Sequence, residues 1–197
     1  KCDVNCDCGR FVEIGNDVYM QYKKTENGYQ ELSKKNVDTG FGLDRLLAFL
    51  NGYTDGYKTD LFSDVIYLLE EKSGKSYNNG GENQRAMRII ADHIRTVVML
   101  IGDENALKPS NTGAGYILRR LLRRAVRYCK KLALTLQDIL SVATIYIDKV
   151  YGEAYPRLVK QKAEILKEIS EEVTRFELTL EKGMKEFEKF MQAIERK

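Results

Sequence analysis

The chain has 197 residues, of which 43% are hydrophobic and 31% are charged, and its formal net charge is +3. This composition fits a globular protein of one or two domains. No apolar run reaches the roughly 20 residues of a membrane-spanning helix, and no signal peptide is visible, so we expect a cytoplasmic protein. The chain begins at Lys1 instead of a methionine, and we therefore expect a piece of a longer protein.

Three of the four cysteines crowd the N-terminus, at Cys2, Cys6 and Cys8. Nothing else indicates secretion, so reduced thiols are expected instead of disulfides. Zinc binding by these cysteines is the more specific alternative. However, the Cys-x₃-Cys-x-Cys spacing differs from that of a standard zinc finger, and a tetrahedral site needs a fourth ligand. The only histidine, His93, is far away in the sequence. The pattern therefore favours a site without zinc, unless residues upstream of this chain complete it.

Strands are predicted in the first part of the chain. Loose alternation over 10–23 indicates one or two strands, interrupted at Gly15. Residues 26–28 give a hairpin signal, with 29–35 as the return strand. Residues 37–45 are typical of a strand that passes through two glycines into a helix. That helix should end near residue 52, and its buried face should consist of Leu43, Leu46, Leu47 and Leu50.

From residue 60 onward, apolar residues recur at helical spacing. Three helices are predicted, over 61–72, 83–101 and 136–150, with a polar loop between the first two. A long helix is predicted over 157–194, where apolar residues at steps of three and four form a near-heptad seam. Its basic and acidic residues balance, which favours a packing helix. The seam could pack within the chain or against another copy, so the oligomeric state stays open.

A loop containing Asn111 leads into the helix with the most uneven charge. At about 100° per residue, roughly 140° of its circumference holds all five arginines, which are Arg119, Arg120, Arg123, Arg124 and Arg127. The opposite side carries Leu118, Leu121, Leu122, Ala125 and Val126. Surface helices usually mix signs, but no Asp or Glu occurs between residues 105 and 137. Such a basic face indicates a polyanionic partner, since Arg matches phosphate geometry.

Several segments together resemble one family. Residues 37–46 resemble motif 3 of class II aminoacyl-tRNA synthetases, with its Gly-x-Gly-x-x-Arg pattern. Residues 88–95 and 109–120 resemble the stretch that follows motif 3 in alanyl-tRNA synthetases, and residues 11–22 resemble the strand before it. The order and the spacing both match.

The resemblance implies an α+β fold. Residues 1–55 would be the last part of a class II catalytic domain, an antiparallel β-sheet with helices. Residues 56–197 would be a mainly α-helical domain that binds the tRNA acceptor stem. The family activates alanine with ATP and Mg, and then esterifies the amino acid to the 3′ end of tRNA.

The resemblance also implies roles for single residues. Asn16, Asp38 and Gly40 would bind alanine, with Asp38 holding its ammonium group and Gly40 lying near its methyl group. Gly42 and Arg45 would bind ATP. Asn111 would read the guanine–uracil wobble pair of the acceptor stem, while the five arginines would clamp flanking phosphates. No catalytic role is expected for His93, because a histidine beside an aspartate on a helix is more often structural.

The sequence departs from the family at Gly15, where a tryptophan usually walls the amino-acid pocket. A glycine there enlarges the pocket or leaves it to be filled by another residue. Asp44 replaces the usual glutamate. Motifs 1 and 2, which carry an arginine for the α-phosphate, and a second wobble-pair reader are outside this chain, so we expect the chain alone to lack a complete active site.

The leading hypothesis is therefore part of a ligase that joins alanine to tRNA. One alternative is a catalytically inactive, truncated paralogue that acts as an RNA-binding module. Another is a helical scaffold whose basic face meets an acidic protein.

Overall fold

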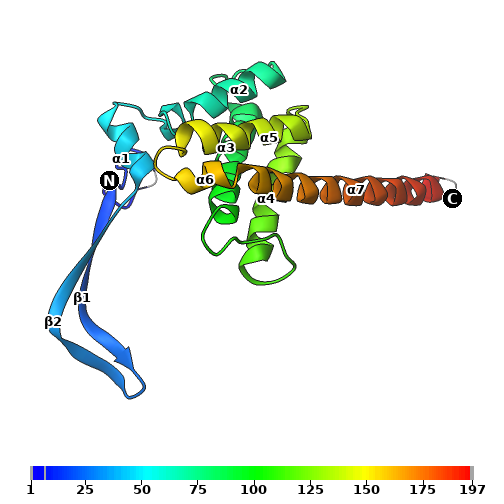
Figure 1. The fold of residues 1–197 in the computed structure, drawn as a ribbon. Helices are drawn as coiled ribbons and strands as arrows, with labels where there is room; N and C mark the ends of the chain where they lie inside the picture. The colour runs from blue at the N-terminus through cyan, green and yellow to red at the C-terminus, as the bar shows by residue number, and fades with distance from the viewer. Residues whose placement is uncertain (1, 7, 196–197) are drawn as a thin grey trace. The chain divides into compact units, whose positions relative to one another are not determined.

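A computed structural model describes residues 2–6 and 8–195, and Figure 1 shows their fold. The chain divides into two compact units, Lys1–Leu61 and Phe62–Lys197. The first contains a two-stranded antiparallel sheet and short helices, and the regular elements described in the second are all helices. The predicted α+β class is confirmed.

The sheet of the first unit is a long hairpin of β1 (Gly15–Thr25) and β2 (Gly28–Phe41). The turn between them lies where the sequence predicts it, and Gly28 takes the positive φ of 108° that favours glycine there. Two expectations were wrong. β1 begins at Gly15 instead of being interrupted there. The predicted return strand over 29–35 and the predicted strand that starts at residue 37 form one continuous strand, β2.

An irregularity in the pairing explains how these strands match. β1 has 11 residues and β2 has 14. Gly15 pairs with Phe41 and the ladder runs regularly to Met20, but it shifts register between Met20 and Tyr22. The extra residues of β2 are absorbed at this point, so that both ends of the hairpin stay paired.

The strand-to-helix transition leads into α1 (Leu43–Leu50), which ends at Asn51, close to the predicted position. The predicted buried face is wrong in part. Only Ala48 is buried, while Leu43 and Leu50 are 65% and 70% exposed. An eight-residue helix followed by the short turn η1 (Gly56–Lys58) has little surface within its own unit on which to bury a leucine stripe.

The helices of the second unit begin with α2 (Ser63–Ser73), α3 (Gly81–Ile101), α4 (Gly113–Lys131) and α5 (Leu136–Ile145). All four lie within a few residues of the predicted helices. α2 ends at Gly74, whose left-handed φ of 65° suits a glycine. α5 begins with a capping box, in which Thr135 accepts from the backbone of Asp138 and the Asp138 side chain accepts in return.

The predicted helix over 136–150 changes its winding before it ends. After α5, residues Tyr146–Val150 form the π-helical turn η2. In this wider turn the Tyr151 amide donates to the Tyr146 carbonyl oxygen at 3.0 Å, and Tyr146 and Ile147 are fully buried.

The single long helix predicted over 157–194 is wrong, because the chain bends at Gln161 between α6 (Pro156–Lys160) and α7 (Lys162–Glu195). Two side chains on either side of this bend, Leu158 and Ile165, pack over Gly102 at the end of α3. A Cβ on Gly102 would lie 2.3 Å from Leu158 Cδ2 and 3.1 Å from Ile165 Cδ1. Both side chains are buried, so α6 and the start of α7 are both held against the end of α3.

The core of the second unit forms around α3, which packs mainly against α4. Buried side chains of α3 recur at steps of three and four, and they are Ala86, Met87, Ile90, Ala91, His93, Ile94, Val97, Val98 and Ile101. From the facing side of α4, Leu118, Leu122, Ala125 and Val126 are buried as predicted. The Tyr146 hydroxyl donates to the Ala91 carbonyl oxygen at 2.9 Å, which satisfies the polar end of a fully buried ring.

A buried ion pair joins α4 to α7. Glu172, which is 1% exposed, accepts a hydrogen bond of 2.7 Å from Arg123 Nε, and Arg123 Nη2 lies 2.7 Å from the same oxygen. The other carboxylate oxygen lies 3.4 Å from Arg175 Nη1. The Arg123 guanidinium also lies 4.9 Å from the centre of the Phe176 ring.

The seam of α7 is buried over only part of the helix. Ile165, Ile169, Val173 and Phe176 are buried, whereas Met184 and Phe187 are 55% and 58% exposed. The packing role predicted for this helix is thus confirmed for its first half only. Among the helices that the structure describes, none is long and apolar enough to span a membrane.

The α4–α7 ion pair makes a prediction about stability. Arg123→Met should lower the free energy of unfolding in urea by about 3 kcal/mol, because it leaves the Glu172 carboxylate buried without its main partner. The double variant with Glu172→Met should recover most of this loss. Arg124→Met is the matched control and should change stability by less than about 0.5 kcal/mol. Equal effects of the two single arginine variants would contradict the stabilising role of the Arg123–Glu172 ion pair.

Candidate active-site hairpin and nucleic-acid interface

The three predicted alanine-binding residues lie on one face of the hairpin. Asn16 pairs with Gly40, and Val18 pairs with Asp38. Opposed residues in an antiparallel ladder share a face, as do residues two apart along one strand. The hairpin therefore brings together an amide, a carboxylate and a glycine from segments more than twenty residues apart in the chain.

Glu13 connects this face to the predicted ATP-binding residue. Its Oε1 accepts a hydrogen bond from Asn16 Nδ2 at 3.2 Å and lies 3.6 Å from Arg45 Nη1. Its carbonyl oxygen accepts from Arg45 Nη1 at 3.0 Å. Arg45 thus leaves the first turn of α1 with its guanidinium held at Glu13, two residues before β1, while its side chain stays 56% exposed.

Gly42, the residue before α1, makes room for this arginine. A Cβ on Gly42 would lie 3.3 Å from Arg45 Cδ and 3.4 Å from Cγ. A side chain there would press on the aliphatic part of Arg45. The amide of Gly42 also donates to the Ile14 carbonyl oxygen at 3.1 Å, which keeps the strand end and the helix start together.

The space beside Gly15 is taken by Phe41, its partner across the strands. A Cβ on Gly15 would lie 2.5 Å from Phe41 Cδ1 and 2.9 Å from the Gly40 carbonyl oxygen. Phe41 therefore occupies the space next to Gly15, and the effect of this glycine on the amino-acid pocket stays a prediction.

The predicted base-reading residue, Asn111, lies at the entrance of α4. Its side-chain oxygen accepts a hydrogen bond from Arg119 Nη1. The Ser110 amide donates to the Gly115 carbonyl oxygen at 3.1 Å, and the Ser110 hydroxyl donates to the Thr112 carbonyl oxygen at 2.8 Å. A Cβ on Gly115 would lie 2.4 Å from the Lys108 carbonyl oxygen, so this glycine lets the loop lie against the helix.

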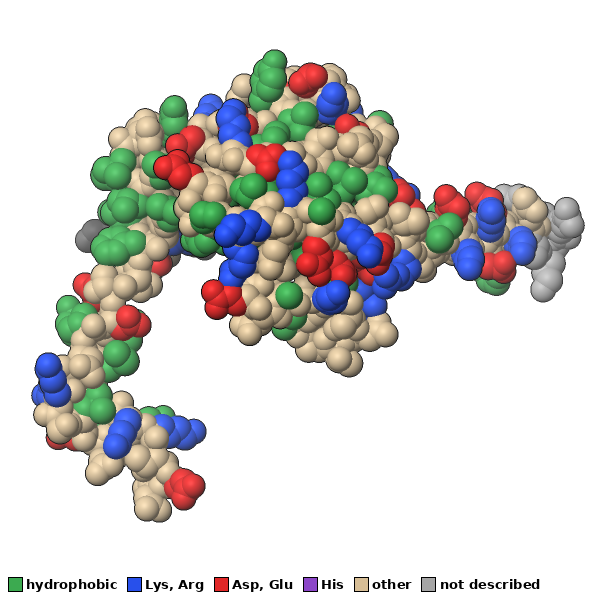
Figure 2. Space-filling model, viewed as in Figure 1, with side chains coloured by type: hydrophobic (Ala, Val, Ile, Leu, Met, Phe, Trp, Pro, Cys, Tyr) green, Lys and Arg blue, Asp and Glu red, His purple; other side chains and the backbone are tan. Residues whose placement is uncertain are grey.

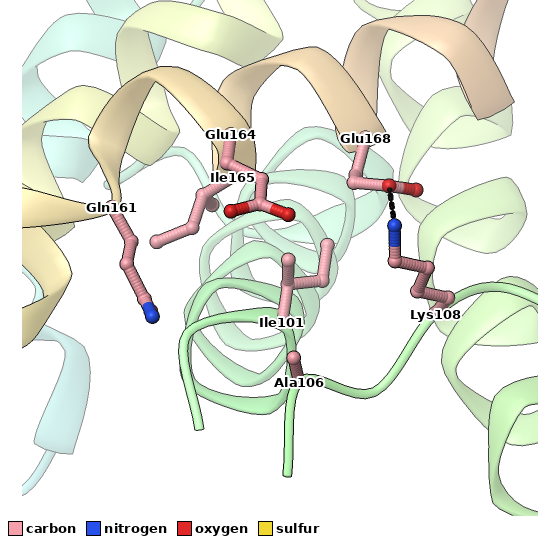
Figure 3. Close-up of a pocket in the computed structure, with 7 residues that line it drawn as sticks. All are labelled: Ile101, Ala106, Lys108, Gln161, Glu164, Ile165 and Glu168. Atoms are coloured by element: carbon pink, nitrogen blue, oxygen red, sulfur yellow. Dashed lines mark hydrogen bonds and ion pairs between the residues drawn. The ribbon is translucent and has the colours of Figure 1, made fainter. Parts of the chain in front are cut away.

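The other end of this loop is tied to α3 and α7, as Figure 3 shows. Lys108 Nζ donates to Glu168 Oε1 at 2.8 Å, and this hydrogen bond raises the pKa of the lysine. The Leu107 amide donates to the Leu100 carbonyl oxygen at 3.2 Å. The hollow beside Ile101 and Ile165 has a volume of about 10 Å³, room for one water molecule at most. These contacts anchor the loop and leave no ligand pocket beneath it.

The five predicted phosphate-binding arginines have different surroundings. Arg119 is bonded to Asn111 and Arg123 to Glu172. Arg120 lies 5.7 Å from the centre of the Tyr116 ring. Arg124 and Arg127 are exposed and have no acidic partner among the described residues. Figure 2 shows basic and acidic side chains side by side on the surface where α7 passes α4.

His93 is buried in α3. Its Nδ1 lies 3.2 Å from Asp92 Oδ2, and its Nε2 has no hydrogen-bond partner among the described residues. The hydrogen bond to His93 lowers the pKa of the Asp92 carboxyl, and the charge of Arg95 adds to this effect. Asp92 thus remains an anion that orients the imidazole.

The three N-terminal cysteines lie together. Their sulfur atoms are all within 4.8 Å of one another, and the sulfurs of Cys2 and Cys8 are 3.2 Å apart. A backbone hydrogen bond from Arg10 and the contact with Cys2 lower the pKa of Cys8, while the same contact raises the pKa of Cys2. All three thiols are free.

Three residues that the sequence did not single out organise these sites, namely Glu13, Phe41 and Glu172. Glu172 could have been noticed, because it falls between apolar seam positions of a helix where a charge is unexpected. Glu13 and Phe41 give no such signal, since their roles depend on the register of the hairpin.

The close approach at Gly115 makes a prediction. Gly115→Ala should lower the melting temperature, because its Cβ would collide with the backbone of Lys108 and displace the Asn111 loop. The matched control is Gly183→Ala, also inside a helix but with open space around it. That variant should be more stable by up to about 1 kcal/mol. Thermal unfolding followed by circular dichroism measures both, and a stabilising Gly115→Ala would contradict the packing described.

Comparison with known proteins places the chain in a family. The model of the family described as "tRNA synthetases class II (A)" matches residues 1–197. An alanine–tRNA ligase of Borrelia hermsii (strain HS1 / DAH) is 42% identical over 198 residues, which cover 100% of this chain and 33% of the relative. For an alanine–tRNA ligase of Treponema pallidum (strain Nichols) the identity is 39% over 201 residues, with the same coverage. The chain spans about a third of the length of these relatives. By this match over its whole length, the chain belongs to the alanyl group of the class II tRNA synthetases.

Proposed function

We propose that the chain is part of an alanine–tRNA ligase, to which it contributes motif 3 of the active site and a surface for the tRNA acceptor stem. The observation that carries this proposal is Asn111, an exposed amide fixed by Arg119 at the start of an arginine-rich helix. Such an arrangement combines one group able to read a base edge with cations able to hold phosphates.

The hairpin face is the proposed alanine site. Asp38 would hold the ammonium group through a charge-assisted hydrogen bond, and Asn16 would contact the amino acid beside it. The backbone does not itself require glycine at position 40, because a Cβ there would lie 3.6 Å from Asn16 Oδ1, an ordinary contact. This supports a role for Gly40 in leaving space for the substrate methyl group.

Arg45 is the proposed contact for ATP. An always-charged planar guanidinium can stack on adenine and neutralise phosphate. Its two contacts with Glu13 would limit the freedom it loses when ATP binds. In the reaction, the alanine carboxylate is joined to the α-phosphate of ATP and pyrophosphate leaves, with Mg accompanying the nucleotide. The residues of this chain would bind and orient both substrates.

Phe41 would take the place of the pocket wall that the family usually builds from a tryptophan at position 15. Its ring lies across Gly15 at the end of the hairpin. An aromatic side chain would thus remain at this end of the proposed pocket, though it would come from the opposite strand. We therefore propose that selectivity for a small amino acid is retained.

The arginines of α4 have different proposed roles, which follow from their contacts. Arg119 would orient the reading amide, because Asn111 offers its oxygen to Arg119 and keeps its NH₂ group as a donor. Arg120, Arg124 and Arg127 would hold phosphates. Arg123 is bonded to the buried Glu172, so we assign it the role of fixing α4 against α7.

Binding to RNA hairpins that copy an alanine acceptor stem tests this division. Binding should weaken steeply as salt rises. Asn111→Ala should lose the preference for a wobble pair over a Watson–Crick pair, because the reading amide is gone. Arg124→Ala should weaken binding to both stems alike and reduce the salt slope by about one unit.

Lys185→Ala, which removes an exposed cation from the distal part of α7, is the matched control and should change neither quantity. A flat salt response would contradict RNA binding and favour a protein partner. If Asn111→Ala kept the preference for the wobble pair, this would contradict the base-reading role of Asn111 but not the binding of RNA.

A second test concerns activity. The chain alone should catalyse no alanine-dependent exchange of pyrophosphate into ATP, because motifs 1 and 2, which carry an arginine for the α-phosphate, are outside this chain. An alanine–tRNA ligase of a full-length relative, assayed in parallel, is the positive control. Clear exchange by the chain alone would contradict its dependence on residues elsewhere in the ligase.

A further inference from the structure

The part of the hairpin near its turn exposes aromatic and basic side chains on one face. Along β1, Tyr22 and Lys24 are two residues apart and therefore point to the same side. Across the strands, Lys24 pairs with Tyr29, and Tyr22 pairs with Glu31. The two tyrosines are 56% and 78% exposed. Figure 2 shows hydrophobic and basic side chains near one another along this hairpin. Tyr22, Lys24 and Tyr29 are called the tip face below.

The two tyrosines of the tip face are spaced to hold bases. Tyr22 and Tyr29 are diagonal neighbours in the ladder, and such residues lie about 7–8 Å apart, within reach of aromatic side chains. Each exposed ring offers a flat apolar surface on which a nucleic-acid base can stack. Lys24 lies directly across from Tyr29, where its ammonium group can reach the phosphate of a nucleotide stacked on that ring.

The charges around the tip face favour a polyanion. Residues 22–35 contain four lysines and two glutamates. Glu31 accepts a hydrogen bond from Gln21 Nε2 at 3.1 Å, and its Oε1 lies 3.9 Å from Lys35 Nζ. The other three lysines of this segment have no acidic partner among the described residues. Unpaired cations interleaved with exposed aromatic rings are typical of surfaces that bind single-stranded nucleic acid.

We propose that the tip face binds single-stranded RNA, namely the unpaired 3′ end of the tRNA that receives alanine. The two tyrosines stack on bases, and the lysines hold the phosphates beside them. This inference rests on the proposed function and deepens it, because it assigns a second part of the RNA to a second part of the chain.

The tip face continues the strand face of the proposed alanine site. Asn16, Tyr22 and Lys24 are separated by even numbers of residues along β1, which is one continuous strand, so their side chains share one side of it. The six residues of strand from Asn16 to Tyr22 span about 20 Å. At about 3.4 Å for each stacked nucleotide, roughly six nucleotides cover this distance. An RNA strand held at the tip face can therefore place its end at the alanine site.

A second copy of the chain fits the tip face less well than RNA does. Its large exposed side chains are tyrosines, and it carries no aliphatic side chain that a protein interface would bury. Two copies joined through this face would also bring Lys24 of one copy close to Lys24 of the other, and like charges repel.

Fluorescence anisotropy with a labelled single-stranded RNA of about eight nucleotides tests the proposal. Tyr22→Ala and Tyr29→Ala should each weaken binding about tenfold, within the range that the loss of one stacked base gives. Tyr29→Phe keeps the aromatic ring and should bind as tightly as the parent chain. Lys24→Ala should lower the slope of log affinity against log salt by about 0.7, the value for one phosphate contact on a single strand.

Tyr19→Ala is the matched control. Tyr19 is also 78% exposed on β1, but it is an odd number of residues from Tyr22 and lies on the other side of the strand. Its loss should leave the binding of single-stranded RNA unchanged. Equal losses in Tyr19→Ala and Tyr29→Ala would overturn the proposal, because they would indicate damage to the hairpin instead of lost stacking.

The proposal is also overturned if Tyr22→Ala and Tyr29→Ala bind as tightly as the parent chain, or if Tyr29→Phe binds as weakly as Tyr29→Ala. A chain that sediments as a dimer and becomes a monomer in Tyr29→Ala would overturn it in favour of a second copy.

A blunt-ended duplex stem separates this proposal from the proposed function. Tyr29→Ala should keep the preference for a wobble pair in that stem, since the preference is assigned to Asn111. A retained preference without binding of single-stranded RNA would overturn the tip-face proposal alone. Binding of single-stranded RNA without any wobble preference would support the tip face and contradict the reading of the acceptor stem.

Discussion

The burial of one side of α4 against α3 is the constraint on which the second unit depends. Leu118 and Leu122 are fully buried, and Val126 is 2% exposed. Once these side chains occupy the interface, the rotation of α4 about its axis is fixed to within a fraction of a turn. The arginines then lie on the outer half of the helix, away from α3. The basic face is thus a consequence of the core as much as of the charges.

Rotation alone does not decide what each arginine does. Arg119 and Arg123, which lie toward one edge of the face, reach neighbouring groups, Asn111 and Glu172. Those farther round meet solvent. The five arginines of α4 look alike in the sequence, but the surrounding structure gives them three different environments. One contacts Asn111, one joins α4 to α7, and the others form an exposed cationic surface.

Local patterns were enough to predict the hairpin turn, the positions of α2 to α5 and the apolar side of α4, because each depends on neighbours within a few residues. Local pattern did not predict the bend at Gln161, because Leu158 and Ile165, seven residues apart on either side of it, keep the spacing of one continuous helix. Nor could it predict the contacts of Glu13 with Arg45 or of Arg123 with Glu172, whose partners are 32 and 49 residues apart. The cysteine cluster was visible as a spacing, but the closeness of its sulfurs was not.

The length of α7 has a consequence for how the molecule moves. Its 34 residues span about 50 Å, yet its buried side chains end at Phe176. In proteins most of the stability of a helix comes from the tertiary packing of its apolar face. The distal turns are therefore ordered mainly by continuation from the anchored half, and they can open and close without disturbing the core. The helix thus carries a gradient of local stability along its own axis, rigid where it braces α4 and loose where its remaining apolar residues face solvent.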